Sequence, residues 1–458
     1  MSNSQAYIDQ NQEKFLEELF ELLRIPSIST DSTKKDAIQE AASFLIHQLE
    51  ELNLDTVKMY ETPGNPIVYG EHCPHPDQPT VLIYGHYDVQ PPDPLDLWDT
   101  PPFEPTVKKG DIYARGASDD KGQSFTHVKA LESYVKSGEP IPVNVKIILE
   151  GEEEIGSPNL VPFLESHKDL LECDMVLISD TSMFGKDQPS ITYGLRGLAY
   201  MEMEVVGPNR DLHSGVYGGA VANPLNVLCE IIAKMKNEDG VVQIPGFYDK
   251  VIPLTEADRE ASHALPFDEE AYKESLDIKE VFGEKGYTTH ERATSRPSLD
   301  VNGIWGGYQG EGAKTVLPGK AGAKVSMRLV PDQHPKEIAK LFQEFVDSIA
   351  PDTVKVTVEE HHGGLPAITD LDFYGLKAAA KAFEHVYETE VLFSREGGSI
   401  PIVADFKRVL GVESILMGFG VTSDAIHSPN EKFSVKDFHR GIKTSAKFLE
   451  ILSQTKAE

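Results

Sequence analysis

TVLIYG occupies residues 80–85, and two more short apolar segments follow it, VNVKIILEG (143–151) and DMVLISD (174–180). Runs of four to eight residues that are rich in β-branched side chains and bounded by turn residues are typical of strands buried in a parallel sheet. Helical patterns separate the three, QSFTHVKALESYVKS (123–137) and NLVPFLESHKDLL (159–171). This alternation of strand and helix predicts an α/β domain with a doubly wound, mainly parallel sheet and right-handed crossovers.

Further patterns extend this domain toward both ends of the chain. Apolar residues at helical spacing predict a helix at 8–23 and another at about 36–52. After the middle of the chain, TDLDFYGLKAAAKAFEHVY (369–387) predicts a helix, and ESILMGFG (413–420) predicts one more buried strand.

The middle of the chain has a different pattern. GLAYMEMEVVGP (197–208), AGAKVSMRLVP (321–331) and TVKVTVEEHH (353–362) alternate as half-exposed antiparallel strands do, and NPLNVLCEIIAKMKN (223–237) predicts a helix. Residues 240–300 are polar and weakly patterned, so their structure is left open. We therefore expect an α+β domain at 197–364, inserted into an α/β domain made of 1–196 and 365–458.

Composition excludes several classes of protein. The 458 residues contain 43 Lys and Arg against 74 Asp and Glu, a formal charge of −31, which argues against binding a nucleic-acid backbone. No apolar run approaches the length of a membrane span. The three cysteines, Cys73, Cys173 and Cys229, have no paired spacing, and the first residues lack the features of a signal peptide. We expect a cytoplasmic protein.

Potential metal ligands follow the predicted strands. His86 and Asp88 follow the first strand, Glu152, Glu153 and Glu154 the second, and Asp180 the third. Asp119 and Asp120 precede a helix in a Gly-rich loop, and His427 lies after the last strand. Each has a common structural explanation, such as a turn, a helix cap or a solvated acidic loop. Ligands bind at the carboxyl ends of strands in open α/β sheets, however, so their joint occurrence indicates a site.

The types of these side chains indicate which ion the site would bind. Imidazole nitrogens and carboxylate oxygens without a thiolate suit Zn²⁺, Mn²⁺ or Co²⁺. Two ions would need a carboxylate that bridges them, and a remaining glutamate could then act as a general base. At its i, i+2 spacing, Asp88 could orient the ring of His86.

The ordered motifs GHYDV, RGASDDKGQ, EGEEEIGS, SDT, DLHSG and IHSPNE resemble those of the M20 metallopeptidase family, most closely its branch of nonspecific dipeptidases and carnosinases. The resemblance covers about residues 15–450. It implies a catalytic α/β domain and an inserted lid domain through which two subunits form a homodimer. It also implies two divalent ions per subunit and a small peptide substrate, with no nucleic-acid or membrane partner.

The resemblance also implies a role for particular residues. Asp119 would bridge the two ions, and Glu153 would be the general base acting on a metal-bridging water. Asp88 would orient His86, and the Asp119–Asp120 peptide bond would be cis. The remaining ligands would be His86 and Asp180 at one ion, and Glu154 and His427 at the other. In the lid, His213 would reach the partner subunit's active site, Arg328 would bind the substrate carboxylate, and Ser399 would line that pocket.

The predicted activity is therefore hydrolysis of the amide bond of dipeptides or similar small peptides. An N-acyl or N-succinyl amino-acid deacylase of the same family would keep every ligand and differ only in its acyl pocket. A noncatalytic metal-binding protein is a third possibility, against which the presence of Glu153 argues. The native metal and the preferred substrate side chains are left open.

Overall fold

The computed structural model describes residues 2–398 and 400–455, which form two compact units. The first unit consists of the chain up to Tyr193, Thr369–Ser394 and the chain from Asp405 onward, and the second of Gly194–Ile368 and Arg395–Ala404. The predicted domain boundaries at 196/197 and 364/365 lie close to two of the positions where the chain passes from one unit to the other. The segment Arg395–Ala404 belongs to the second unit, whereas the prediction from sequence places it in the α/β domain. The catalytic and lid roles of the two units remain predictions.

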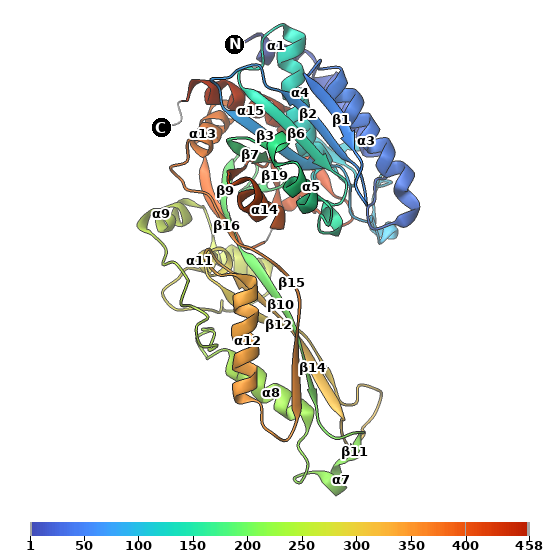
Figure 1. The fold of residues 1–458 in the computed structure, drawn as a ribbon, viewed down its shortest axis with the longest axis vertical. Coiled ribbons are helices and arrows are strands. Elements are labelled where there is room, and N and C mark those ends of the chain that lie inside the picture. Colours follow the sequence, from blue (N-terminus) through green and yellow to red (C-terminus); the bar gives the residue numbers. More distant parts are fainter. Residues whose placement is uncertain (1, 399, 456–458) are drawn as a thin grey trace. The chain divides into compact units, whose positions relative to one another are not determined.

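The first unit contains most of the helices and strands (Figure 1). Before the second unit they are α1 (Asn3–Gln10), α2 (Gln12–Arg24), α3 (Lys35–Glu50), β1 (Thr56–Tyr60), β2 (Ile67–His72), β3 (Thr80–His86), β4 (Thr106–Lys108), β5 (Asp111–Tyr113), α4 (Lys121–Ser137), β6 (Asn144–Glu150), α5 (Leu160–Ser166), α6 (Lys168–Leu171), β7 (Met175–Ile178), β8 (Ser182–Met183) and β9 (Ser190–Leu195). After it they are α13 (Tyr374–Tyr387), β17 (Leu392–Glu396), α14 (Pro401–Leu410), β18 (Glu413–Leu416), β19 (Gly420–Val421), β20 (Lys432–Ser434) and α15 (Val435–Gln454). The strands β9 and β17 and the helix α14 cross a boundary between the units.

The large sheet has the strand order β1-β2-β6-β3-β7-β18-β9-β16, where β16 is Ala367–Ile368, and β17 also pairs with β9. Its centre is parallel, because β3 pairs with β6 and β7, and β7 with β18, in that sense. The pairs β1–β2, β2–β6 and β18–β9 toward its edges are antiparallel. The predicted α/β class is confirmed, and the sheet is mixed rather than parallel throughout.

Helices cover both faces of this sheet, as a doubly wound fold requires. On β3, the ring of Tyr84 packs edge-on against Phe406 of α14 at a centroid distance of 5.3 Å. The next residue, Gly85, points the other way, toward α4. A Cβ atom at Gly85 would lie 2.6 Å from the Cβ of Ser124 and 2.8 Å from an oxygen of Asp120. Glycine at this position therefore lets the start of α4 approach the end of β3.

The second unit is α+β, as expected. Its main sheet has the order β12-β14-β10-β15, formed by β10 (Gly197–Val206), β12 (Ser298–Gly306), β14 (Lys320–Leu329) and β15 (Lys355–Gly364). All three strand pairs are antiparallel. The unit also contains β11 (Leu212–His213), α7 (Ser214–Tyr217), α8 (Pro224–Met235), α9 (Glu256–Ala264), α10 (Glu269–Ser275), α11 (Thr289–Thr294), β13 (Val316–Leu317), α12 (Pro335–Ile349) and β16 (Ala367–Ile368).

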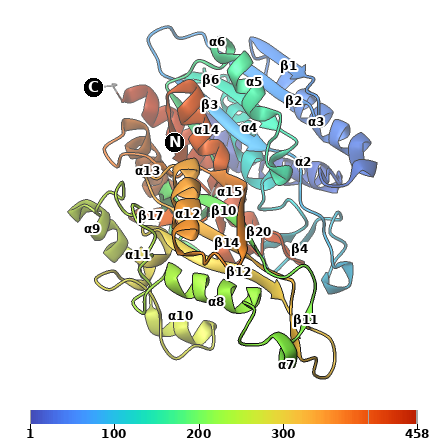
Figure 2. The same cartoon turned by 60° about the horizontal axis from the view of Figure 1, so that its bottom comes forward.

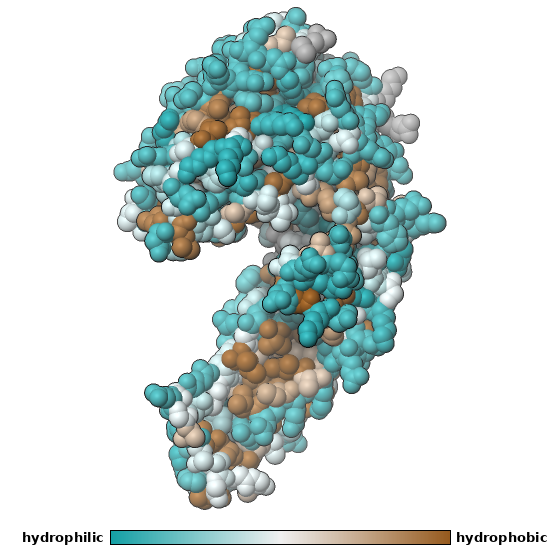
Figure 3. Space-filling model, turned by 180° about the vertical axis from the view of Figure 1, so that it is seen from behind, coloured by the Kyte–Doolittle hydropathy of each residue, from teal (hydrophilic) through white to brown (hydrophobic). Residues whose placement is uncertain are grey.

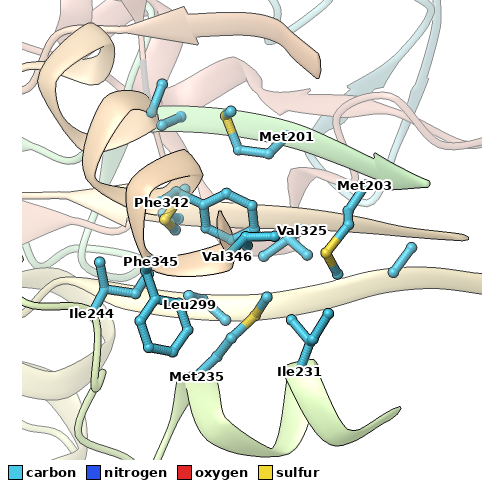
Figure 4. Packing of buried hydrophobic residues seen from close by; sticks show 14 of the residues in the cluster. Met201, Met203, Ile231, Met235, Ile244, Leu299, Val325, Phe342, Phe345 and Val346 are labelled. Atoms are coloured by element: carbon cyan, nitrogen blue, oxygen red, sulfur yellow. The ribbon is translucent and has the colours of Figure 1, made fainter. Parts of the chain in front are cut away.

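One hydrophobic core holds the second unit together. Figure 2 shows α8 and α12 beside the sheet, and alternate residues of β10, such as Met201 and Met203, face these helices. Figure 4 shows Phe342 and Val346 of α12 and Ile231 of α8 packed with them. The period of two on the strand and the helical spacing on α8 and α12 thus bury one shared apolar face.

No helix among the described residues combines the length and the apolar character that a membrane crossing requires.

Candidate active site

The parallel strands bring four of the predicted site segments to one edge of the sheet. The strand β3 ends at His86, which pairs with Glu150 at the end of β6. On the other side of β3, Tyr84 pairs with Ile178, the last residue of β7, so that Asp180 follows two residues later. Because parallel strands share a direction, these chain ends and the loops after them meet. The loop before α4 brings Asp119 to the same place, and the Asp119–Asp120 peptide bond is cis, as the resemblance implied.

Two groups of potential metal ligands share the carboxylate of Asp119. In the first group, Nε2 of His86 lies 3.1 Å from Oδ1 of Asp119 and 3.9 Å from Oδ2 of Asp180. In the second, Nε2 of His427 lies 2.9 Å from Oδ2 of Asp119 and 3.4 Å from Oε2 of Glu154. Within each group the donor atoms lie within 4.8 Å of one another. Asp119 therefore presents one oxygen to each group.

Asp88 lies behind His86 and contacts more than that ring. Its backbone carbonyl is 3.1 Å from Nδ1 of His86 and its Oδ1 is 3.4 Å away, which leaves Nε2 facing the ligand group. Its two carboxylate oxygens also accept the backbone N–H groups of Glu153 and Glu154, at 3.2 and 3.1 Å. One buried aspartate thus fixes both the imidazole and the turn that carries the glutamates.

The three consecutive glutamates have different surroundings. Glu152 turns away from the ligand groups and accepts hydrogen bonds from the backbone N–H of Asn65 and the side chain of Asn159. Glu154 lies beside His427 and accepts a hydrogen bond of 2.7 Å from the side chain of Gln90, a contact that no sequence motif had indicated. The side chains of Glu152 and Glu154 therefore have different partners, and only Glu154 belongs to a ligand group.

Burial and mutual repulsion raise the pKa of several of these acids. Burial raises the pKa of Glu153 to about 8, and the nearby charges of Asp180 and Glu154 add to the rise. Burial raises the pKa of Asp180 to about 7, and the charge of Asp119 adds to it. Hydrogen bonds to Asp119 and Glu154 raise the pKa of His427 to about 10. The carboxylates thus attract positive charge, which protons on the histidines supply when no metal ion does.

In the described part of the chain, no lysine or arginine forms an ion pair with the carboxylates of the two ligand groups. Among residues 2–398 and 400–455, the ion pairs of Asp119, Glu154 and Asp180 are with histidines alone. The nearby ammonium of Lys121 is buried and points elsewhere, donating to the backbone carbonyls of Leu22 and Ile25 at 3.1 and 2.7 Å. Histidine nitrogens and carboxylate oxygens with an excess of negative charge fit divalent cations.

The substrate residues expected in the lid belong to the second unit. His213 ends β11 and is exposed, and its Nδ1 accepts the backbone N–H of Gly215 at 3.0 Å. Arg328 is half-buried on β14, where its neighbours across the sheet are Leu198 and Ser298. Ser399 lies outside the described residues. The five expected ligands, Asp88 and the glutamate turn all lie in the first unit.

A doubly wound α/β unit with two ligand groups that share a carboxylate at its strand ends is an arrangement typical of metal-dependent enzymes. The chain belongs to peptidase family M20/M25/M40, whose sequence model matches residues 82–451. This confirms the predicted family resemblance. Membership of this family also explains the excess of carboxylates in the two ligand groups, because metallopeptidases of this kind bind divalent cations.

Relatives that are named as dipeptidases match nearly the whole chain. The Cys-Gly metallodipeptidase dug1 of Schizosaccharomyces pombe is 34% identical over 97% of this chain and 97% of its own length. The human Beta-Ala-His dipeptidase is 30% identical over 98% of this chain and 92% of its own. The solved structure of the dipeptidase Dug1p of Saccharomyces cerevisiae has 32% identity and a TM-score of 0.81, covering 99% of both chains. The prediction that the chain is an enzyme of the metallodipeptidase type is confirmed.

Proposed function

We propose that the protein hydrolyses the amide bond of dipeptides or similarly small peptides with two divalent ions. The observation that carries this proposal is the pair of ligand groups joined by Asp119, in a chain whose relatives are named as a Cys-Gly metallodipeptidase and a Beta-Ala-His dipeptidase. One ion would bind His86, Asp119 and Asp180. The other would bind Asp119, Glu154 and His427. The donor set favours Zn²⁺ or Mn²⁺, with Co²⁺ as a substitute.

The residues around the ligand groups suit an acid–base role for Glu153. Bound divalent ions would supply Lewis acidity, polarising the scissile carbonyl and lowering the pKa of a water. Glu153 would accept the proton of the attacking water and pass it to the leaving amine nitrogen. The carboxylate of Asp88 would hold Glu153 in place by accepting the backbone N–H of Glu153. The backbone carbonyl of Asp88 would keep the ring of His86 turned toward Asp119 and Asp180. His213 would donate a hydrogen bond to the developing oxyanion.

A panel of substrates tests the proposed function against deacylation. We expect dipeptides with a free α-amino group to be hydrolysed faster than the matching N-acetyl or N-succinyl amino acids, with Mn²⁺ and Zn²⁺ each supplied. Initial rates on both series, measured at equal enzyme and metal concentrations, decide the matter. Faster turnover of the blocked series would identify a deacylase, and no turnover of either with both metals would favour a noncatalytic binder.

Arg328 is proposed to bind the C-terminal carboxylate of the substrate. A guanidinium binds a carboxylate through two parallel hydrogen bonds, which fixes both distance and angle. A second cation lies close by, because Arg196 precedes Gly197, which pairs with Leu329 next to Arg328. Burial together with the charge of Arg328 lowers the pKa of Arg196 to about 10. Two guanidinium groups near each other favour an anionic ligand.

We therefore expect Arg328→Ala to lower kcat/KM for a free-carboxylate dipeptide by more than about tenfold, beyond the 0–1 kcal/mol of a surface ion pair. Arg328→Lys should rescue only partly, since an ammonium lacks the planar fork. The matching dipeptide amide is the control, measured with wild type and variant. An equal loss on the acid and the amide would mean that Arg328 only stabilises its own unit.

We also propose that the second unit forms a homodimer and that His213 serves the partner subunit's active site. Apolar residues gather on one face of this unit (Figure 3), and its exposed hydrophobic side chains include Val216 and Tyr217 beside His213, and Val301 and Ile304 on the edge strand β12. Exposed apolar patches and unpaired strand edges favour association.

Complementation between two inactive variants measures this sharing. We expect mixed His213→Ala and Glu153→Gln subunits to regain part of the wild-type dipeptidase activity, because some hybrid sites combine two intact residues. Subunit exchange must be demonstrated separately, for example by mass spectrometry of the mixed dimer. Exchange without any recovery of activity would argue that each site uses its own His213.

We further propose that the enzyme works in the cytoplasm, since Cys73, Cys173 and Cys229 are all free thiols. Immunodetection in fractionated cells would contradict this if the protein were found in a secreted fraction.

A further inference from the structure

We infer that Glu431 is a positioning residue that fixes Asp119 against the loop of His427 and so sets the affinity of the proposed metal site. The inference rests on the proposed function, because it concerns how the same ligand groups are held. Glu431 is the last residue of the IHSPNE motif and lies four residues beyond His427. It is fully buried, and it belongs to neither ligand group.

The carboxylate of Glu431 accepts four hydrogen bonds, all from the segment that ends at Asp119. Its Oε2 accepts from the Arg115 guanidinium at 2.7 Å and from the backbone N–H of Gly116 at 3.0 Å. Its Oε1 accepts from the backbone N–H of Ser118 at 2.9 Å and of Asp119 at 3.1 Å. Every acceptor position is thus used to hold the backbone that leads into the shared ligand.

Further hydrogen bonds join the backbone of the Asp119 segment to the loop that carries His427 and Glu431. The carbonyl of Glu431 accepts the N–H of Ala114 at 3.1 Å. The other terminal nitrogen of the Arg115 guanidinium, Nη2, donates to the carbonyls of Pro91 and Ser428 at 3.2 and 3.3 Å. The buried pair of Arg115 and Glu431 therefore connects the Asp119 loop to the residue directly after His427.

The His427 loop needs such an anchor. Ala425, His427 and Asn430 all have positive φ angles, of 56°, 58° and 63°, a backbone region that costs energy for residues other than glycine. The side chain of His427 is 55% exposed, so packing alone does not fix it. At the end of the loop, Glu431 accepts the backbone N–H of Ser118 and Asn430 accepts that of Asp99, and these hydrogen bonds fix the backbone that carries the imidazole.

The hydrogen bonds of Glu431 to the Asp119 segment and its place in the His427 loop together fix the distance between these two ligands. Asp119 Oδ2 and His427 Nε2 are 2.9 Å apart, and each side chain extends from a backbone that Glu431 joins to the other. Partners behind metal ligands commonly contribute about 10–100-fold to metal affinity. Glu431 acts on the cation only through Asp119 and His427, so its loss weakens binding without removing a ligand.

Isothermal titration of the chelator-stripped protein with Mn²⁺ tests this. Glu431→Gln keeps the shape of the side chain but turns one acceptor oxygen into an NH₂ donor that faces N–H groups. We expect the Mn²⁺ dissociation constant to rise by about 10–100-fold. Dipeptide hydrolysis should recover as Mn²⁺ is raised, with KM for the dipeptide unchanged, which damage to the fold would not produce.

Glu132→Gln is the matched control. Glu132 is equally a buried acid of the first unit. It lies on α4, eleven residues after Lys121 at the start of that helix, and forms ion pairs with Lys129 of α4 and Lys14 of α2. Its substitution should lower the melting temperature while leaving Mn²⁺ affinity as in wild type. If Glu431→Gln does not fold, Glu431→Asp keeps the charge beside Arg115 and shortens the reach, and the same loss of affinity is expected.

Wild-type affinity for Mn²⁺ in either folded Glu431 variant overturns the inference. An equal loss of affinity in Glu132→Gln does so too, because the effect would then be a general loss of stability. These outcomes leave the proposed function intact. A wild-type protein that binds no Mn²⁺ and hydrolyses no dipeptide contradicts the proposed function itself.

Discussion

Replacing Glu153 with glutamine is expected to lower kcat for dipeptide hydrolysis by about 10²–10⁴-fold, the usual contribution of a general base, while two metal ions stay bound. An amide of the same shape cannot accept the proton of the attacking water, but Glu153 belongs to neither ligand group. The measurement pairs steady-state rates with metal content per chain, determined by elemental analysis of the purified variant.

The neighbouring glutamates supply matched controls. Glu152→Gln should retain turnover, because Glu152 contacts Asn65 and Asn159 and not the ligand groups. Glu154→Gln should lose metal, because Glu154 lies 3.4 Å from His427 within the second group. If Glu154→Gln keeps both ions and Glu153→Gln loses one, the roles of base and ligand are exchanged.

Asp119→Asn should remove both ions and abolish activity. Asp119 presents one oxygen to His86 and the other to His427, so an amide in its place turns an NH₂ group toward one of the two ligand groups. The charge that binds the cations falls at both groups at once. We expect a loss of metal affinity larger than the roughly 10–100-fold that the loss of an outer partner causes.

Asp180→Asn provides the comparison, since Asp180 belongs to the first group alone. Metal content should fall to about one ion per chain in Asp180→Asn and below that in Asp119→Asn, if each group binds one ion. Retention of two ions by Asp119→Asn would contradict the shared-ligand arrangement, whatever happens to the rate.

The sequence was sufficient to predict the parallel centre of the sheet and the meeting of its ligand-bearing loops. Continuous apolar runs such as TVLIYG identify buried strands, and parallel strands necessarily bring the residues after them, here His86 and Asp180, to one edge. The antiparallel edges, such as β1 with β2, were not predicted, because pairing direction depends on neighbours that local patterns do not specify.

Local hydrogen bonding explains the errors in the helices. The pattern at 8–23 predicted one helix, whereas α1 ends at Gln10 and α2 begins at Gln12. Between them, Asn11 has non-helical backbone angles (φ −116°, ψ 17°), and its side chain and its backbone N–H both donate to the carbonyl of Tyr7. In the unassigned stretch 240–300, capping boxes begin α9 and α11 at Thr255 and Thr288. Those signals were present in the sequence, but the helices are too short to show a clear period.

The roles of Glu431 and Gln90 could not be found from motifs. The partners of Glu431 are mostly backbone N–H groups, which every sequence provides, and the contact between Gln90 and Glu154 joins two loops that are distant along the chain. Residue type and spacing identify ligands because metals select side chains. They do not identify the groups that hold a backbone in place.

The contact of Lys121 with the end of α2 affects where the first unit begins. The family match starts at residue 82, yet the ammonium of Lys121, two residues after Asp119, donates hydrogen bonds to the carbonyls of Leu22 and Ile25. The strand β2 likewise completes the backbone bonding of β6. Residues of the segment 2–81 therefore pack against the part of the chain that the family model matches. A fragment trimmed to residues 82–451 would expose a sheet edge and leave a buried ammonium group without its acceptors.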